Sequence, residues 1–114
     1  MSQTRGENLR QLCGSAPVFA ALGDRTRLAL IARLGRGSPL SISRLTQGSS
    51  LTRQAITKHL RVLQHAGLVR GIRKGRENLF EIEPSPLIRA RRSLDRLSRE
   101  WDDALARLKS FVEE

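Results

Sequence analysis

The side chains best suited to molecular recognition in this sequence are hydrogen-bonding groups that recur between residues 53 and 61. If this segment is helical, successive side chains turn by about 100°, and the polar ones fall within one continuous arc of about 140°. They are Arg53, Gln54, Thr57, Lys58 and Arg61. The opposite arc contains Ala55, Ile56, Leu60, Val62 and Leu63. A helix divided in this way packs its apolar face on a core and presents its polar face to a partner.

Capping signals give this helix its bounds. Leu51 and Thr52 fit the N′ and N-cap positions, and Ile56 is placed to form a hydrophobic staple. Gly67 supplies the left-handed conformation that ends many helices. The sequence therefore predicts a helix over about residues 52–65.

A second helix start lies shortly before the first. Leu40, Ser41 and Leu45 stand in the same N′, N-cap and N4 relation as their counterparts in the later helix. The small residues 48–50 leave room for only a tight turn between the two helices. This arrangement is typical of a helix-turn-helix.

A basic hairpin, the wing, is expected after the second helix, over about residues 68–83. The segments 68–73 and 79–83 fit two strands joined through a loop over 74–78. A helix-turn-helix followed by such a hairpin is the layout of a winged helix-turn-helix, a mainly α fold with a small β-hairpin.

A long final helix is expected from about residue 87 to residue 112, because Pro84 and Pro86 should break the preceding strand. Apolar side chains recur in it in steps of three and four, the heptad pattern of a helix that is packed along its length. They are Leu87, Ala90, Leu94, Leu97, Trp101, Ala104, Leu108 and Phe111. A small domain offers little surface for so long a stripe, so the pattern favours self-association over packing on the same chain.

The N-terminal third should supply further helices. A helix over residues 9–22 is predicted to contain a break or bend between Gly14 and Pro17. Asp24 is placed to cap the next helix, and its core stripe is predicted to be Leu28, Ile31 and Leu34.

The formal net charge of +10 is unevenly distributed. No Asp or Glu occurs between Asp24 and Glu77, whereas basic residues occur throughout that interval. They are Arg25, Arg27, Arg33, Arg36, Arg44, Arg53, Lys58, Arg61, Arg70, Arg73, Lys74 and Arg76. A field of one sign favours a polyanion, and nucleic acid is the first candidate. A merely solvated charged surface does not explain why the charges coincide with a helix-turn-helix and its hairpin.

Length and composition indicate one domain over residues 1–114, since a chain of this size suits one modest core. The N-terminus does not resemble a signal peptide and the apolar runs are too short to span a bilayer, so a cytoplasmic protein is expected. The single Cys13 is interpreted as a small apolar filler, with an intersubunit redox sensor as the alternative. No nucleophile with a base, glycine-rich phosphate loop or paired carboxylates can be assembled, so no enzyme is expected.

Over nearly its whole length the sequence resembles the ArsR (arsenical-resistance repressor) family of winged-helix transcription regulators. The segments that carry the resemblance are VFAALGDRTRLALIARL at 18–34, LSISRLT at 40–46 and QAITKHLRVLQHAGLVRGIRKGRENLFEI at 54–82. The resemblance implies a homodimer, built from the terminal helices, that binds a partly palindromic operator in double-stranded DNA. It also implies repression of transcription until an effector binds.

The same resemblance assigns roles to individual residues. The helix that follows the turn enters the major groove in this family, so base reading is expected of Arg53, Gln54, Thr57 and Lys58. Contacts with the DNA backbone are expected of Thr52, Arg61, Arg73, Lys74 and Arg76. The heptad stripe of the final helix places the expected dimer interface at Leu87, Leu94, Leu97, Trp101, Leu108 and Phe111.

Metal sensing is disfavoured. Metal-sensing members of the family carry cysteines in the helix before the recognition helix, where this chain has the segment 40–43 without a thiol. A second family site uses Asp and His on the last helix, where this chain has Asp95, Asp102 and Asp103 but no histidine. Carboxylates alone on a solvated helix bind transition metals poorly, so no metal or other cofactor is expected. A small-molecule effector is left unassigned.

The two histidines do not suggest a ligand pair. His59 falls in the apolar arc and is interpreted as a buried structural histidine or an indirect phosphate contact. His65 lies in the last turn of the helix, where it can complement the helix C-terminus.

The sequence thus predicts a sequence-specific, DNA-binding transcription regulator. The alternative is a winged-helix module that binds another protein, or nucleic acid without sequence preference. Selectivity distinguishes the two, because a specific reader prefers its site over other DNA by about a thousandfold or more.

Overall fold

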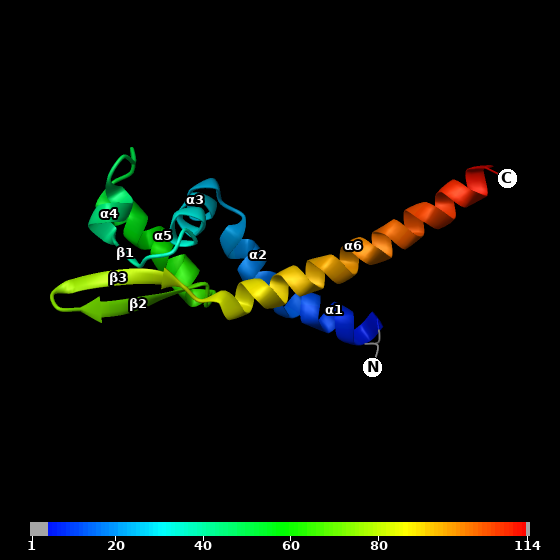
Figure 1. Ribbon diagram of the computed structural model, residues 1–114, viewed down its shortest axis with the longest axis horizontal. Helices are drawn as coiled ribbons and strands as arrows, with labels where there is room; N and C mark the ends of the chain where they lie inside the picture. The colour runs from blue at the N-terminus through cyan, green and yellow to red at the C-terminus, as the bar shows by residue number, and fades with distance from the viewer. Residues whose placement is uncertain (1–4, 114) are drawn as a thin grey trace.

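The computed structural model describes residues 5–113 and consists of a helical body from which a hairpin and a long helix extend (Figure 1). The helices are α1 (Arg5–Gly14), α2 (Ala16–Leu22), α3 (Arg25–Leu34), α4 (Ile42–Thr46), α5 (Arg53–His65) and α6 (Pro84–Glu113). The strands are β1 (Leu40–Ser41), β2 (Val69–Lys74) and β3 (Glu77–Ile82). This is the predicted winged helix-turn-helix, mainly α with a small sheet.

The N-terminal segment forms two helices, as the predicted break implies. Ser15 separates α1 from α2 and is buried, while Pro17 sits in the first turn of α2, where a missing amide hydrogen costs nothing. α1 packs against α6, and α2 packs against both α3 and α6. Cys13 is exposed on α1, so its interpretation as an apolar filler was wrong.

Helix α3 begins where the sequence predicts, but it buries a different face. The Asp24 carboxylate accepts a hydrogen bond of 3.0 Å from the Arg27 amide and caps the helix. Leu30 and Leu34 are buried, whereas Leu28, predicted to be in the core, is 50% exposed. The run from Leu28 to Ala32 is apolar on every side, so periodicity alone could not choose the buried face.

The core is built largely from leucines of the helix-turn-helix and its neighbours. The side chains that are almost completely buried come from α4, α5 and the start of the hairpin: Leu45, Ile56, Leu60, Leu63 and Leu68. Val18 and Ala21 of α2, Leu30 and Leu34 of α3 and Ala90 of α6 complete the same cluster. One continuous core therefore holds α5 in place from several sides.

Both predicted caps of the helix-turn-helix are present. The hydroxyl of Ser41 accepts from the Arg44 amide at 3.1 Å, and that of Thr52 accepts from the Ala55 amide at the same distance. α5 ends in a Schellman motif: Gly67 has φ 76°, its amide donates to the Gln64 carbonyl, and the Leu68 amide donates to the Leu63 carbonyl. The recognition helix thus ends at the predicted residue, and the chain turns directly into the wing.

The sheet has three antiparallel strands in the order β1-β3-β2, one more than predicted. The two-residue strand β1 pairs Leu40 with the buried Phe80 and was too short to show a sequence pattern. The hairpin strands reach further than expected, since Lys74 pairs with Glu77 and only Gly75 and Arg76 form the turn. Gly75 has φ 63° and Arg76 does not have a positive φ, which fits a type II′ turn.

Helix α6 starts at Pro84, three residues before the predicted start. Pro84 and Pro86 lie in its first turn, where proline is tolerated, so they initiate the helix instead of preceding it. The C-terminal half projects away from the body (Figure 1). The radius of gyration is 18.5 Å, against about 13 Å for a compact chain of this length.

The Asp24 cap predicts a pH dependence of stability. Its hydrogen bond from the Arg27 amide, together with the positive charges of Arg27 and His59, lowers the carboxyl pKa below its ordinary value of 3.8. A carboxyl with a lowered folded-state pKa contributes fully above the ordinary pKa, and the contribution is lost as the pH falls through the folded-state pKa. Asp24→Asn keeps a capping side chain without the charge, and should show a smaller loss of stability on acidification below about pH 4 than the wild type.

Chemical denaturation of both proteins at several pH values between 2 and 6 measures this difference. Parallel stability curves for wild type and Asp24→Asn would contradict a charge-dependent cap.

Candidate nucleic-acid interface

The polar face of α5 is largely exposed to solvent in the structure. Arg53, Gln54, Lys58 and Arg61 are exposed and Thr57 is half-buried, and these five side chains line one shallow hollow on the outside of the helix. The buried face consists of Ile56, Leu60 and Leu63. Val62, which the angular count placed on the apolar face, is 41% exposed. It lies near the edge of that arc, beyond the reach of the core.

Local hydrogen bonds orient two of the predicted base-reading side chains. The Thr57 hydroxyl donates to the Arg53 carbonyl at 2.8 Å, which leaves the oxygen free to accept from a partner. One terminal nitrogen of Arg53 donates to the Ser43 hydroxyl at 3.3 Å, which ties the start of α5 to α4. The remaining donors of the Arg53 guanidinium stay available.

A second hollow connects α5 to the wing. It is lined by Ser41, Ile42, Ser43, Arg53, Arg76, Glu77 and Asn78. Ser43 and Asn78 had no predicted role, because isolated polar residues in a short helix and at the start of a strand carry no periodic signal. Arg73, Lys74 and Arg76 are exposed toward the end of the hairpin. The structure therefore joins the exposed face of α5 to the basic wing in one surface.

Not every basic residue of the acid-free interval belongs to this surface. Arg33 donates to the carbonyls of Leu45 at 3.0 Å and Arg44 at 2.9 Å, and so satisfies backbone acceptors at the end of α4. Arg70 pairs with Glu81 across the hairpin, and with Glu83 at 3.7 Å. Arg33 and Arg70 thus serve the fold, and sequence position alone could not separate them from residues free to bind a partner.

His59 and Arg27 form a polar cluster with Asp24 at the start of α3. The Arg27 guanidinium donates to the Ala21 carbonyl at 2.6 Å, and another of its nitrogens lies 3.4 Å from Nδ1 of His59. That His59 nitrogen is also 3.8 Å from the Asp24 carboxylate. These contacts link α5 to α3 and agree with the structural interpretation of His59. His65 is exposed at the end of α5.

Within residues 5–113, no group of three or more His, Cys, Asp or Glu side chains is placed to hold a metal ion. In the same span, no helix combines the length and the apolar character that crossing a bilayer requires.

Comparisons with known proteins show that the chain is similar to helix-turn-helix transcription regulators. The helix-turn-helix domain family matches residues 22–72, from the end of α2 into the wing. The HTH-type transcriptional regulator Rv2034 of Mycobacterium tuberculosis is 36% identical over 87 residues, which cover 76% of this chain and 78% of the relative. The uncharacterized HTH-type transcriptional regulator YuzN of Bacillus subtilis is 41% identical over 76 residues, covering 61% of this chain and 83% of that protein.

A solved structure agrees with these relatives. The ArsR-like transcriptional regulator from Rhodococcus sp. RHA1 shares 40% sequence identity, covers 90% of this chain and 93% of its own, and superposes with a TM-score of 0.73. Transcription regulators of this kind bind DNA and are not enzymes. By sequence and by fold, the chain belongs to the ArsR family of winged helix-turn-helix transcription regulators.

Proposed function

We propose that the chain is a homodimeric repressor that binds a partly palindromic DNA operator. The observation that carries the proposal is the continuity between the exposed donor-rich face of α5 and the basic wing. An α-helix fits the major groove of B-DNA, and a basic hairpin beside it can reach the neighbouring phosphates.

Base reading falls to the side chains on the outer face of α5. Arg53 and Lys58 can donate to the acceptors of guanine, and Gln54 can bond adenine in a bidentate manner. Thr57, whose hydroxyl hydrogen is engaged by the Arg53 carbonyl, is left to accept a hydrogen bond or contact a thymine methyl group.

Backbone contacts fall to the edge of α5 and the wing. The Thr52 hydroxyl accepts from the Ala55 amide and keeps its own hydrogen for a phosphate oxygen. Arg61 is exposed one helical turn beyond the base-reading residues. On the wing, the side chains of Arg73, Lys74 and Arg76 make no hydrogen bond or ion pair with residues 5–113, so their charges are free for phosphates.

The dimer is proposed from α6. Leu87 and Ala90 pack on the core of their own chain, and Leu97 contributes to a hollow beside α1. Other large apolar side chains of α6 are exposed: Leu94, Trp101, Leu105, Leu108, Phe111 and Val112. So long an apolar stripe is unstable in water without a partner, and the same stripe of a second copy is the partner of matching chemistry.

Repression with relief by an effector rests on the family resemblance. A protein that recognises nucleic acid without sequence preference is the competing function, and duplex selectivity separates the two. A specific regulator should prefer its operator over scrambled DNA by about a thousandfold or more at physiological salt.

The first prediction concerns base reading. Arg53→Ala or Gln54→Ala should weaken operator binding by about 1–3 kcal/mol and relax the preference at one or two base pairs, because each removes a contact with base edges. Titration of each variant against the operator and its single-base substitutions measures both effects. Unchanged selectivity in Arg53→Ala would refute the assignment of that residue.

Changes in the wing should behave differently. Arg73→Ala and Arg76→Ala should weaken binding to operator and scrambled DNA alike and reduce the salt slope of log K by about one each, because phosphate contacts carry no sequence information. Arg99→Ala, an equal loss of charge on α6, is the control and should leave the slope close to the wild-type value. A loss restricted to the operator would instead place the wing residues on bases.

A further prediction follows from the donor set. Zn²⁺, Cd²⁺ or arsenite at modest excess should leave operator affinity unchanged, since the thiolates that soft metal sites need are missing from α4. Titration with and without chelator tests this. A chelator-reversible tenfold loss would reveal a site shared between subunits, with Cys13 as a ligand.

The dimer prediction uses a residue that the single chain leaves free. Leu108 is 60% exposed, so Leu108→Asp should not disturb the monomer. In a dimer, the Leu108→Asp substitution would bury two carboxylates without partners, which should make the free energy of association less favourable by several kcal/mol. Ser110→Asp, off the heptad stripe, is the matched control. Sedimentation should show dimeric wild type and Ser110→Asp, and largely monomeric Leu108→Asp with weak operator binding.

Trp101 gives an independent readout, as it is the only tryptophan and is 61% exposed in the single chain. Its emission should shift to longer wavelength on dilution through the dimer dissociation range. The bound operator should contain inverted half-sites whose centres are separated by about 10 base pairs or a multiple. A wild type that is monomeric at micromolar concentration would exclude α6 as the interface.

A further inference from the structure

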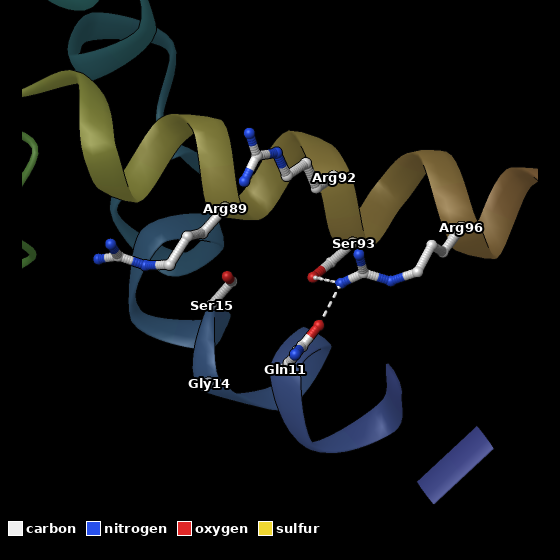
Figure 2. Close-up of a pocket in the computed structure, with 7 residues that line it drawn as sticks. All are labelled: Gln11, Gly14, Ser15, Arg89, Arg92, Ser93 and Arg96. Carbon is white, nitrogen blue, oxygen red and sulfur yellow. Dashed lines mark hydrogen bonds between the residues drawn. The ribbon is translucent and has the colours of Figure 1, made fainter. Parts of the chain in front are cut away.

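A hollow lies between α6 and the junction of α1 with α2, on elements that take no part in the proposed DNA surface (Figures 1 and 2). Its volume is about 430 Å³, within the range of small-molecule sites. The lining residues are Gln11, Gly14, Ser15, Arg89, Arg92, Ser93 and Arg96. Three arginines thus line one hollow, whose lining contains no carboxylate; Arg96 reaches toward Gln11 and Ser93, while Arg89 and Arg92 are exposed at its rim.

The arginine charges are not compensated by the protein. Arg89, Arg92 and Arg96 follow one another on α6 at spacings of three and four, where like charges repel each other. The side chains of Arg89 and Arg92 make no hydrogen bond or ion pair with residues 5–113. By contrast Arg91, on the same helix but outside the hollow, has Asp95 at 4.0 Å. An anion in the hollow would remove a repulsion that the fold itself leaves in place.

Hydrogen-bonding groups of Arg96 and Ser15 complete the lining. One nitrogen of Arg96 donates to Gln11 at 2.6 Å and to Ser93 at 3.1 Å, which bridges α1 and α6, while its Nε is buried without a partner (Figure 2). Ser15 occupies the N-cap position of α2, yet its hydroxyl makes no capping bond. Figure 2 shows that hydroxyl directed toward α6. These groups are donors that an oxyanion can use.

We propose that this hollow binds a small organic acid with two or more carboxylate or phosphate groups. Guanidinium groups match the planar oxygen pairs of both anions, and the volume exceeds what one inorganic oxyanion fills. DNA phosphates are a poor fit, because the hollow lies on α1, α2 and α6, apart from α5 and the wing (Figure 1).

A bound acid would hold α1 and the base of α6 together. α6 continues directly from β3 of the wing, and its C-terminal half carries the apolar stripe. If the proposed function holds, the anion therefore acts as the effector, by changing the angle between the dimer helices and the DNA-binding body and so the spacing of the two recognition helices.

Binding is tested on the full chain without DNA, by calorimetry at constant ionic strength. The probes are citrate and succinate for the carboxylate class, 3-phosphoglycerate for the phosphate class, and inorganic phosphate and chloride as simple anions. At least one organic polyanion should bind at least about tenfold more tightly than inorganic phosphate, and the better class identifies the natural group.

The matched variants are Arg89→Gln/Arg92→Gln, which removes two lining charges, and Arg91→Gln/Arg99→Gln, which removes two charges of the same helix outside the hollow. The first should lose at least about tenfold in affinity for the best probe, and the second should change it by less than about threefold. Equal losses, or no probe that binds better than inorganic phosphate, would overturn the site. The latter is also the result expected if a partner subunit fills the hollow.

The regulatory step has its own readout. The best probe should change operator affinity of the wild type by about fivefold or more, and leave that of Arg89→Gln/Arg92→Gln unaffected. Calorimetric binding with unchanged operator affinity would overturn the effector role and keep the site. Failure of the protein to select any DNA would overturn the proposed function, and would not affect the calorimetric result.

Discussion

The orientation of α5 depends on the burial of Ile56, Leu60 and Leu63, and much of the recognition surface follows from it. These side chains enter a core to which α2, α3, α4 and the sheet contribute, so α5 cannot rotate about its axis without removing leucines from the core. Its polar face must then point outward. The Schellman motif at Gly67 fixes the direction in which the chain leaves the helix, and Leu68 returns at once to the same core. Packing at the centre therefore determines where the wing begins relative to the recognition helix.

The basic residues divide by what their hydrogen bonds do. Arg27 and Arg33 satisfy backbone carbonyls at helix ends, where water would otherwise be needed. Arg70 is held by the carboxylates of Glu81 in β3 and of Glu83 just after it. Among the charges left free, those on α5 and toward the end of the wing share one surface, where a polyanion can neutralise them. Arginine thus stabilises the helix-turn-helix through hydrogen bonds to its backbone and also contributes positive charge to its surface.

Local chemistry made much of this arrangement predictable from the sequence. The caps at Ser41, Thr52 and Asp24 depend on a few adjacent residues, and the stop at Gly67 needs only a left-handed conformation, so helix boundaries were close to the prediction. The predictions failed where contacts between distant parts of the chain determine the local structure. Leu28 could not be assigned to a face, because the run from Leu28 to Ala32 is apolar on every side and contacts with the rest of the fold determine which side is buried. The strand β1 exists because Leu40 meets Phe80, and a pair of residues has no pattern of its own. The hollow at Ser15 and Arg96 is lined by residues from both ends of the chain, so no pattern within one segment of the sequence predicts it.

Helix α6 combines three environments along one continuous element, and its sequence changes accordingly. Near its start Leu87 and Ala90 face the core of the same chain. In the next turns arginines and Ser93 face α1, where close packing gives way to a polar hollow. Toward the C-terminus the apolar residues continue at heptad spacing although the chain has no further surface to cover them. An isolated helix gains too little from propensity alone to retain such a length in water, and exposed leucine and phenylalanine side chains add a cost that only burial removes. The part of α6 that contributes least to the fold of one chain is therefore the part whose sequence most requires a second one.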